Sequence, residues 1–273
     1  MAITTEDGIV AGMRQPVAFM KATFTGEAAG QIADLGGLAG IPSARVLAAP
    51  GMAGATVTNA SAIGGMIPWT DPSSGNAYLA KLAASVGANI IGFLLYDLLW
   101  YQSGIAETTT TAQTVNSVAW PSRSADGTAN GEGVEIWMHT TTATTNAGTI
   151  AGSTYSYTNQ AGTAGRSAGM PYVWPISAVA GTMVPFAWQS GDTGVRSVQT
   201  VTLTTSYGGG QIELFALRRI AYCPFVGATS GMLLDWGGLG FPQLYNGSAL
   251  YMAVLLSGTA AGTTSGDLAF SHG

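Results

Sequence analysis

Three carboxylates lie close together in the segment SADGTANGEGVE, residues 124–135, and these residues have the clearest potential for chemistry. Asp126, Glu132 and Glu135 could supply the acid and base pair that glycoside hydrolysis requires. Asp126, Asn130 and Glu132 also offer the oxygen ligands that calcium prefers, although their spacing departs from that of an EF-hand loop. The alternative is a surface loop in which Asp, Asn and Gly serve turn geometry. We favour the loop, and so predict no enzyme activity and no bound metal or cofactor.

The histidines and the single cysteine do not form a catalytic or metal-binding pattern. His139 falls within an expected strand and His272 lies next to the C-terminus, so the chain lacks the spacing of a histidine metal site. We expect His139 to be a half-exposed strand residue. Cys223 is the only cysteine, which excludes an intramolecular disulfide and predicts a buried thiol. The sequence contains no P-loop, zinc-protease or serine-hydrolase motif.

The composition indicates a surface that is polar but nearly uncharged. Charged residues make up 8% of the 273 residues, against roughly 25% in an ordinary soluble protein, while glycine (39 residues), threonine and serine are abundant. Net charge and scattered charged side chains normally keep soluble chains apart, so such a surface is poorly protected against association. The composition therefore favours a protein whose surface is largely covered by partners.

The charge balance argues against nucleic acid and membrane partners. The net charge is −5 and the pI about 4.8, and Lys21 and Lys81 are the only lysines, whereas a general nucleic-acid binder needs clustered basic residues. The longest apolar stretch, NIIGFLLYDLLWY at residues 89–101, is too short to span a bilayer and contains Asp97. The start, MAITTEDGIV, lacks the basic and apolar regions of a signal peptide, so we expect a soluble chain made in the cytoplasm.

Residues 1–70 differ in character from the rest of the chain. Glycine and alanine interrupt each apolar run, as in TGEAAGQIADLGGLAG, and leave room only for a short helix around Ala28–Leu35. The segment is too apolar for a solvated tail and too rich in glycine to build its own core. We therefore predict an extended N-terminal arm over residues 1–70, ordered by packing on its own domain or on a neighbouring subunit.

Residues 71–273 are expected to form one all-β domain, an antiparallel β-sandwich of jelly-roll-like type. Apolar alternation over NAYLAKLAASV, from residue 76, favours a strand over the helix that alanine would allow, and the short GAN turn then leads to the apolar IIGFLLYDLLW. Turn residues separate further candidate strands, with no convincing helix between them. These strands start at residues 134, 153, 181, 195, 211, 249 and 267. The expected core includes Leu82, Leu95, Ile136, Val184, Val201, Phe215 and Val254.

Two of the expected strands, QIELFALRRIAY from 211 and ALYMAVLLSG from 249, are apolar on both faces. A strand with one wet face should alternate apolar with polar residues, so both strands are expected to be covered on each side, by the chain's own loops, by the arm or by another subunit. The seven tryptophans have no repeat spacing and are expected in core and interface packing rather than in a carbohydrate platform. The candidates for a subunit interface are Ile9, Phe19, Phe24, Leu35, Leu38, Tyr222, Tyr251 and Leu255.

Several segments of the sequence resemble proteins encoded among the virion genes of tailed bacteriophages. These segments are LLYDLLWYQSGI, TTTTAQTVNSVAWPSR, YSYTNQAGTAGR and FAWQSGDTGVRSVQTVTLTTSY, in that order, and the resemblance covers residues 66–257. It is most specific in YTNQAGTAGR and GDTGVRSVQ. The resemblance implies a structural component of a virion, and it brings no catalytic residues with it.

Together with the acidic and weakly charged composition, this resemblance predicts a head decoration or cement protein that binds and stabilises the capsid lattice. Its partners would be the major capsid protein or other virion proteins and further copies of itself, most simply in a homotrimer, and its location would be the virion. The alternatives are a tail, neck or receptor-binding component and a virion-associated glycosidase. The major capsid protein itself is disfavoured because its fold contains a long helix that this sequence lacks.

Overall fold

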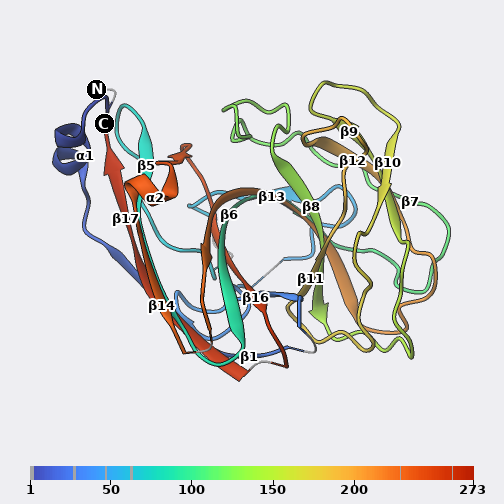
Figure 1. Ribbon diagram of the computed structural model, residues 1–273. Helices are drawn as coiled ribbons and strands as arrows, with labels where there is room; N and C mark the ends of the chain where they lie inside the picture. The colour runs from blue at the N-terminus through green and yellow to red at the C-terminus, as the bar shows by residue number, and fades with distance from the viewer. Residues whose placement is uncertain (1–2, 27–28, 47, 62–63, 228, 260) are drawn as a thin grey trace. The chain divides into compact units, whose positions relative to one another are not determined.

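The chain forms two compact units (Figure 1). The computed structural model describes residues 3–26, 29–46, 48–61, 64–227, 229–259 and 261–273. Unit 1 combines residues 1–46, 58–97 and 220–273, and unit 2 combines residues 47–57 and 98–219. The chain passes from one unit to the other after residues 46 and 57, and again inside two long strands, β6 (Ile90–Gln102) and β13 (Gln211–Pro224).

Unit 1 is built from two antiparallel sheets. One sheet has the strand order β14-β5-β17-β1-β3, with β15 also paired to β5. The other contains β2, β16 and the first part of β6. The two sheets pack on each other through aromatic side chains, since Phe19 of β1 stacks on Phe93 of β6 with ring centroids 5.1 Å apart. The strands are β1 (Val17–Thr25), β2 (Ile32–Asp34), β3 (Gly40–Ile41), β5 (Ala77–Val86), β14 (Gly231–Asp235), β15 (Gln243–Leu244), β16 (Leu250–Leu256) and β17 (Ala261–His272).

Unit 2 is likewise antiparallel. One sheet has the order β10-β9-β12-β7, and a second contains β11, β8 and the first part of β13. The short strand β4 pairs with the end of β6. The strands are β4 (Ala55–Thr56), β7 (Gln113–Thr114), β8 (Val134–Thr142), β9 (Thr154–Asn159), β10 (Arg166–Gly169), β11 (Thr182–Pro185) and β12 (Val195–Thr202).

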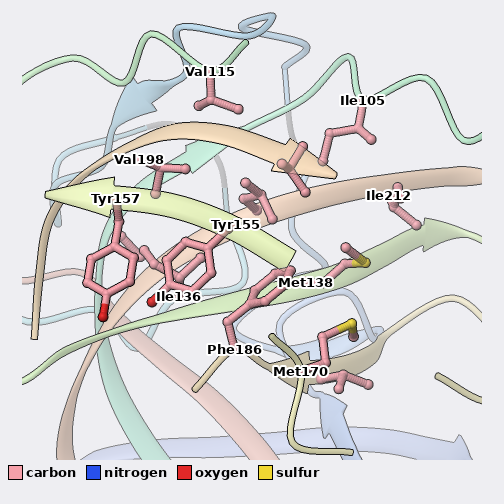
Figure 2. Close-up of a cluster of buried hydrophobic side chains, with 14 of the residues drawn as sticks. Ile105, Val115, Ile136, Met138, Tyr155, Tyr157, Met170, Phe186, Val198 and Ile212 are labelled. Atoms are coloured by element: carbon pink, nitrogen blue, oxygen red, sulfur yellow. The ribbon is translucent and has the colours of Figure 1, made fainter. Parts of the chain in front are cut away.

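The core of unit 2 explains the alternation of tyrosines in STYSYTN. In β9 the side chains of Tyr155 and Tyr157 point to one side, where their rings stack with centroids 4.6 Å apart (Figure 2). Tyr155 also contacts Phe186 at 4.8 Å, and Figure 2 shows these rings among Ile136 and Met138 of β8. Serine and threonine occupy the alternate positions, which lie half-buried on the other face of the strand.

Helices contribute little to the described part of the chain, where they are limited to α1 (Glu6–Gly12) and the four-residue α2 (Trp236–Leu239). Among the described residues, no helix is long and apolar enough to cross a membrane. The all-β, antiparallel sandwich expected from the sequence is confirmed, including the strand rather than helix over Ala77–Val86.

The seven expected core residues are all buried, with at most 4% of any side chain exposed. They belong to two cores rather than to one, because Leu82, Leu95 and Val254 lie in unit 1 and the other four in unit 2. The short turn at Gly87–Asn89 does not form a hairpin between two paired strands. It joins strands of different sheets, since β5 pairs with β14, β15 and β17 whereas β6 pairs with β16 and β4.

The expected boundary at residue 70 is not where the chain divides. Residues 1–46 belong to unit 1, in which β1 lies between β17 and β3 and pairs with both. The N-terminal segment is therefore extended, as expected, and it is ordered by its own unit because its alternating apolar residues complete the sheet. The short helix considered around Ala28–Leu35 is wrong, since Ile32–Asp34 forms strand β2 and pairs with β16; Ala28 lies outside the described residues.

The two strands with apolar residues on both faces are covered on both sides, as expected. In β16 every residue is buried except the half-buried Leu255, and β13 is buried continuously from Ile212 to Arg218. The chain itself provides this cover, so the apolar pattern does not require another subunit.

Candidate functional site: the loops around Asp192

Asp192 is the centre of a polar cluster in unit 2. Its carboxylate is 2% exposed and accepts hydrogen bonds from the Tyr157 hydroxyl (2.6 Å), the Asn159 amide (2.7 Å) and two guanidinium nitrogens of Arg166 (2.9 and 3.0 Å). The three donors all belong to the segment YTNQAGTAGR, and Asp192 belongs to GDTGVRSVQ. The cluster therefore joins two separate segments of the sequence.

The β9–β10 hairpin positions the three donors. Strand alternation places Tyr157 and Asn159 on one face of β9, and the hairpin returns Arg166 to a position directly opposite Tyr157. The turn between them is closed by Asn159, whose backbone N–H donates to the Thr163 carbonyl (3.0 Å) and whose side-chain oxygen accepts from the Thr163 N–H (2.8 Å). The glycine-rich loop of this segment thus has a local purpose, which is to bring Arg166 back to the acceptor.

The acidic segment at 124–135 is attached to the same loops. The Glu132 carboxylate accepts from the Thr193 hydroxyl (2.8 Å), and the Gly133 N–H donates to the Thr193 carbonyl (2.9 Å). Gly131 has a φ of +84°, and a Cβ at this position would overlap the backbone carbonyl of Val195. Three loops, at residues 124–133, 159–166 and 189–195, are therefore held together at one end of the β9–β12 sheet.

The other two carboxylates of the acidic segment have separate partners. Asp126 closes its own turn by accepting from the Thr128 N–H (3.0 Å) and hydroxyl (2.8 Å). Glu135 pairs with Arg219 (2.6 Å) and accepts from the Trp137 indole (2.9 Å). Across the described residues, no group of three or more His, Cys, Asp and Glu side chains has the geometry to hold a metal ion. The structure thus uses these carboxylates in turns and ion pairs.

Electrostatics keep Asp192 ionised. Burial acts to raise the pKa of this carboxyl group, but the hydrogen bonds from Arg166, Tyr157 and Asn159 outweigh it and bring the pKa down to about 2. Burial and the hydrogen bond to Asp192 together raise the pKa of Tyr157. Neither group titrates near neutral pH, so the cluster is unsuited to proton transfer and suited to fixing loops.

We expect the chain to leave polysaccharides intact, because the carboxylates near Asp126–Glu135 are held by separate partners. The measurement is release of reducing ends from host capsule or cell-wall polysaccharide by the purified protein, with Glu132→Gln and Glu135→Gln as matched variants. Cleavage that is lost in either variant would contradict this expectation and would establish the glycosidase alternative.

His139 and Cys223 are both buried, whereas His272 is half-buried. His139 is 1% exposed and stacks on Phe215 with ring centroids 4.5 Å apart, so the expected half-exposed position is wrong. The strand is covered on both faces, which local alternation cannot show. Cys223 is buried as expected, and burial raises the pKa of its thiol to about 11. Five of the seven tryptophans, at 69, 100, 120, 137 and 174, are buried, which favours core packing over a carbohydrate platform; Trp188 is half-buried and Trp236 is 37% exposed.

Most of the expected interface residues are in the core of unit 1. Five of the eight are buried by the chain itself, so their side chains are not available to another subunit in this fold: Ile9, Phe19, Phe24, Leu35 and Tyr251. Leu38 and Leu255 are half-buried and Tyr222 is 42% exposed, and an interface role for these three stays a prediction. The apolar residues of the N-terminal segment are buried because β1 and β2 pair with strands of unit 1, which places these side chains inside the sandwich of that unit.

Unit 1 contains a second buried polar cluster, whose residues the sequence analysis did not propose as a site. Asp34 pairs with Arg45 at 2.6 Å, and both side chains are at most 3% exposed. Lys21 is fully buried and donates to the carbonyls of Leu38 (3.1 Å) and Pro42 (2.7 Å); burial lowers its pKa to about 8. No spacing motif joins these residues, which come together only through the pairing of β1 with β3 and of β2 with β16.

The surface of unit 2 carries very little exposed charge. Among its described residues, the exposed charged side chains are those of Asp126, Arg196 and Arg219. Its other charged residues are half-buried or buried. The sequence from 136 to 191 contains a single charged residue, Arg166, which is the partner of Asp192. A surface of this kind loses little electrostatic solvation when another protein covers it.

Comparisons with known proteins do not assign the chain to a family. No protein-family model matches it, and no curated protein matches it. Solved structures that it is similar to include the infectious bursal disease virus VP2 subviral particle (8% identity, TM-score 0.20, 94% of this chain and 80% of that chain covered). The Gt strain of the same virus gives 8% identity and a TM-score of 0.20 over 95% and 82% of the two chains. A TM-score of 0.20 does not show a common fold.

Proposed function

We propose that this chain is a structural protein of a bacteriophage virion, and more specifically a head decoration protein that binds and stabilises the capsid lattice. The observation that carries the proposal is the nearly uncharged surface of unit 2, where Asp126, Arg196 and Arg219 are the exposed charged residues among those described. A monomer that works alone in solution normally carries scattered charge over its whole surface.

The side chains that replace charge on this surface suit a protein interface. Threonine, serine, alanine and glycine allow close approach of another backbone and contain no ion to desolvate. Several large apolar side chains are also exposed on unit 2, including Tyr172 (65%), Val173 (55%) and Ile176 (52%). The resemblance of YTNQAGTAGR and GDTGVRSVQ to virion proteins supports the same function, because the Asp192 cluster gives both segments one structural role.

Stabilisation of a capsid would follow from mass action. A protein that binds the assembled lattice but not its free subunits stabilises the assembled state by the free energy of that binding. The net negative charge of the chain argues for a position on the outside of the head, away from packaged DNA. The partners would be the major capsid protein and further copies of this chain, most simply in a homotrimer.

We expect purified protein to bind capsids that lack it, saturably and in hundreds of copies per particle, and to raise the temperature at which those particles release DNA. The measurements are gel densitometry of purified particles and a thermal release assay with and without added protein. A dozen or fewer copies per virion would contradict a lattice role and favour a neck or tail component. Equal binding to unassembled shell protein would contradict stabilisation by mass action.

Deletion of the N-terminal segment is not a suitable test of binding. Removing residues 2–50 would take β1, β2 and β3 out of unit 1 and expose its core. A better variant for testing binding replaces an outward-facing side chain such as that of Leu233, which is 61% exposed on β14, because this substitution changes the surface without removing core residues.

A further inference from the structure

Strand β14 is an open edge of the larger sheet of unit 1. It pairs with β5 on one side and ends the strand order of that sheet, so no described strand lies on its other side. Edge strands expose backbone hydrogen-bonding groups to strand addition, which proteins prevent with charged residues, proline or very short strands. β14 has five residues, and the sequence from 226 to 234 contains neither a charged residue nor a proline.

Other strands at sheet edges in the described chain are better protected. β3, β4, β7 and β15 have two residues each, which is too short to hold an added strand. β10 starts with the charged residue Arg166. β14 is therefore the edge at which strand addition meets the least obstruction.

The backbone groups that β14 presents are those of Gly231, Leu233 and Asp235. The Val86 N–H donates to the Ser230 carbonyl (2.9 Å), so these two residues form a hydrogen-bonded pair of the antiparallel ladder. Because hydrogen-bonded and non-hydrogen-bonded pairs alternate, every second residue from Ser230 bonds to β5. The N–H and C=O groups of the three residues between them point away from β5. All three residues are exposed, including 61% of Leu233.

The open edge is symmetric about Leu233. At one end the extended backbone is broken at Thr229, which has a φ of +54°. At the other end Asp235 begins helix α2, where its carboxylate accepts from the Gly238 N–H (2.9 Å). Leu233 is thus the middle one of the three outward residues, and it carries their only large apolar side chain. A strand of this kind is complementary to an antiparallel copy of itself.

We propose that β14 pairs antiparallel with β14 of a second copy of this chain, around a two-fold axis at Leu233, so that two sheets become one. Leu233 then faces Leu233 of the second copy, and Gly231 faces Asp235, so each outward backbone group has a partner. Any other two-fold axis along β14 places an outward residue opposite Thr229 or α2, where the strand has ended. An axis at Asp235 would also set two carboxylates opposite each other.

The contact lies in the plane of the sheet. The added strand lies beside β14, on the side away from β5, so the part-exposed Lys81–Asp267 ion pair on β5 and β17 is not covered. A pair of short strands buries less than the roughly 1,200–2,000 Å² of a stable, specific interface, so the contact is weak between two free copies. It gains strength when copies are held together in an assembly, where it would join neighbouring trimers of the kind proposed above.

Cysteine substitutions on β14 of the full chain test the contact and its register. Leu233→Cys should form a disulfide-linked dimer with itself under mild oxidation, because a hydrogen-bonded pair has Cα atoms about 5.5 Å apart, which suits a disulfide. Met232→Cys and Leu234→Cys should link to each other when mixed, since position 232 faces 234 of the second copy. Each of these two alone should stay monomeric, because identical positions are then diagonal neighbours about 7–8 Å apart.

The matched control is Val226→Cys, a residue that is 98% exposed and lies outside β14. We expect the 233–233 and 232–234 products to form at least about tenfold faster than the 226–226 product, because the contact raises the effective concentration of the thiols. Adding Leu233→Lys to both mixed variants should bring the 232–234 product down to the control rate, since it sets two like charges opposite each other. The native Cys223 does not interfere, because it is buried and its pKa is raised to about 11.

Two results would overturn the proposal. The first is a 233–233 product no faster than the 226–226 product, which would leave β14 open to a strand of another protein. The second is fast self-linking of Met232→Cys or Leu234→Cys, which would place the axis elsewhere. The measurement needs no capsid, so its outcome is independent of the proposed decoration function.

Discussion

Replacing Asp34 by alanine is expected to lower the free energy of unfolding by about 4 kcal/mol, because removal of one partner from a buried ion pair typically costs 3–5 kcal/mol. The carboxylate neutralises the Arg45 guanidinium at 2.6 Å, in a place where neither side chain is more than 3% exposed. The carboxylate also accepts hydrogen bonds from the backbone N–H groups of Gly36 (2.5 Å) and Gly37 (3.2 Å), so the substitution removes the acceptor of both N–H groups.

The surroundings of Asp34 make relaxation difficult. The Arg45 guanidinium lies 5.3 Å from the centroid of the buried Tyr251 ring, and the fully buried Lys21 ammonium adds a second positive charge nearby. Without the carboxylate, Arg45 would remain a buried cation without its counter-ion, and the pKa of Lys21 would fall further because Asp34 acts to raise it.

The measurement for Asp34→Ala is urea unfolding followed by tryptophan fluorescence, with the wild-type chain measured in parallel. Asp7→Ala, an exposed aspartate of the same unit, is the matched control and should change stability by less than about 0.5 kcal/mol. A loss of less than 1 kcal/mol for Asp34→Ala would mean that water enters the site and solvates Arg45, contrary to the burial described.

The second large effect is expected for Asp192→Ala, which should destabilise unit 2 by about 2 kcal/mol, since hydrogen bonds to charged groups contribute roughly 1.5–3 kcal/mol. Asp192 is the common acceptor for Tyr157, Asn159 and Arg166, so its loss releases the loops at 159–166 and 189–195 together. The effect stays below that of Asp34→Ala because Arg166 is 26% exposed and water replaces part of its interaction.

The contribution of Asp192 should depend on pH in a defined direction. Its pKa in the folded chain is about 2, below the unfolded value of about 3.9, so the folded state favours the ionised form. This contribution is fully present above pH 5 and is lost as the pH falls through about 2. The difference in unfolding midpoint between the wild-type chain and Asp192→Asn should therefore be smaller at pH 3 than at pH 7.

Asp126→Ala is the control for both Asp192 experiments, since Asp126 is exposed and serves only its own turn. It should change stability by less than about 1 kcal/mol. A pH-independent difference for Asp192→Asn would show that the carboxylate is not responsible, and that the effect comes from altered packing of the loops.

The sequence by itself determined the local structure of this chain. The turn-bounded segments VEIWMHTTT and STYSYTN predict strands that the structure contains as β8 and β9, and ALYMAVLLSG, apolar on both faces, predicts a strand covered on both faces, which is β16. These properties follow from the residues of one segment, because the strand period of two places neighbouring side chains on opposite faces whatever the partner strand is. Burial of the expected core residues follows for the same reason.

Only the tertiary structure decided which segments meet. The pairing of β1 with β17 joins residues more than two hundred positions apart, and each of the two units is made of separate stretches of the chain. Asp192 lies 35 positions from Tyr157 and 26 from Arg166, and Asp34 lies 11 from Arg45, so strand alternation within one segment predicts neither cluster. Local periodicity is the same for a strand in either unit and at either edge, so it contains no information about partners. That choice is made by the burial of complementary faces and buried charges in the folded chain, which no single segment contains.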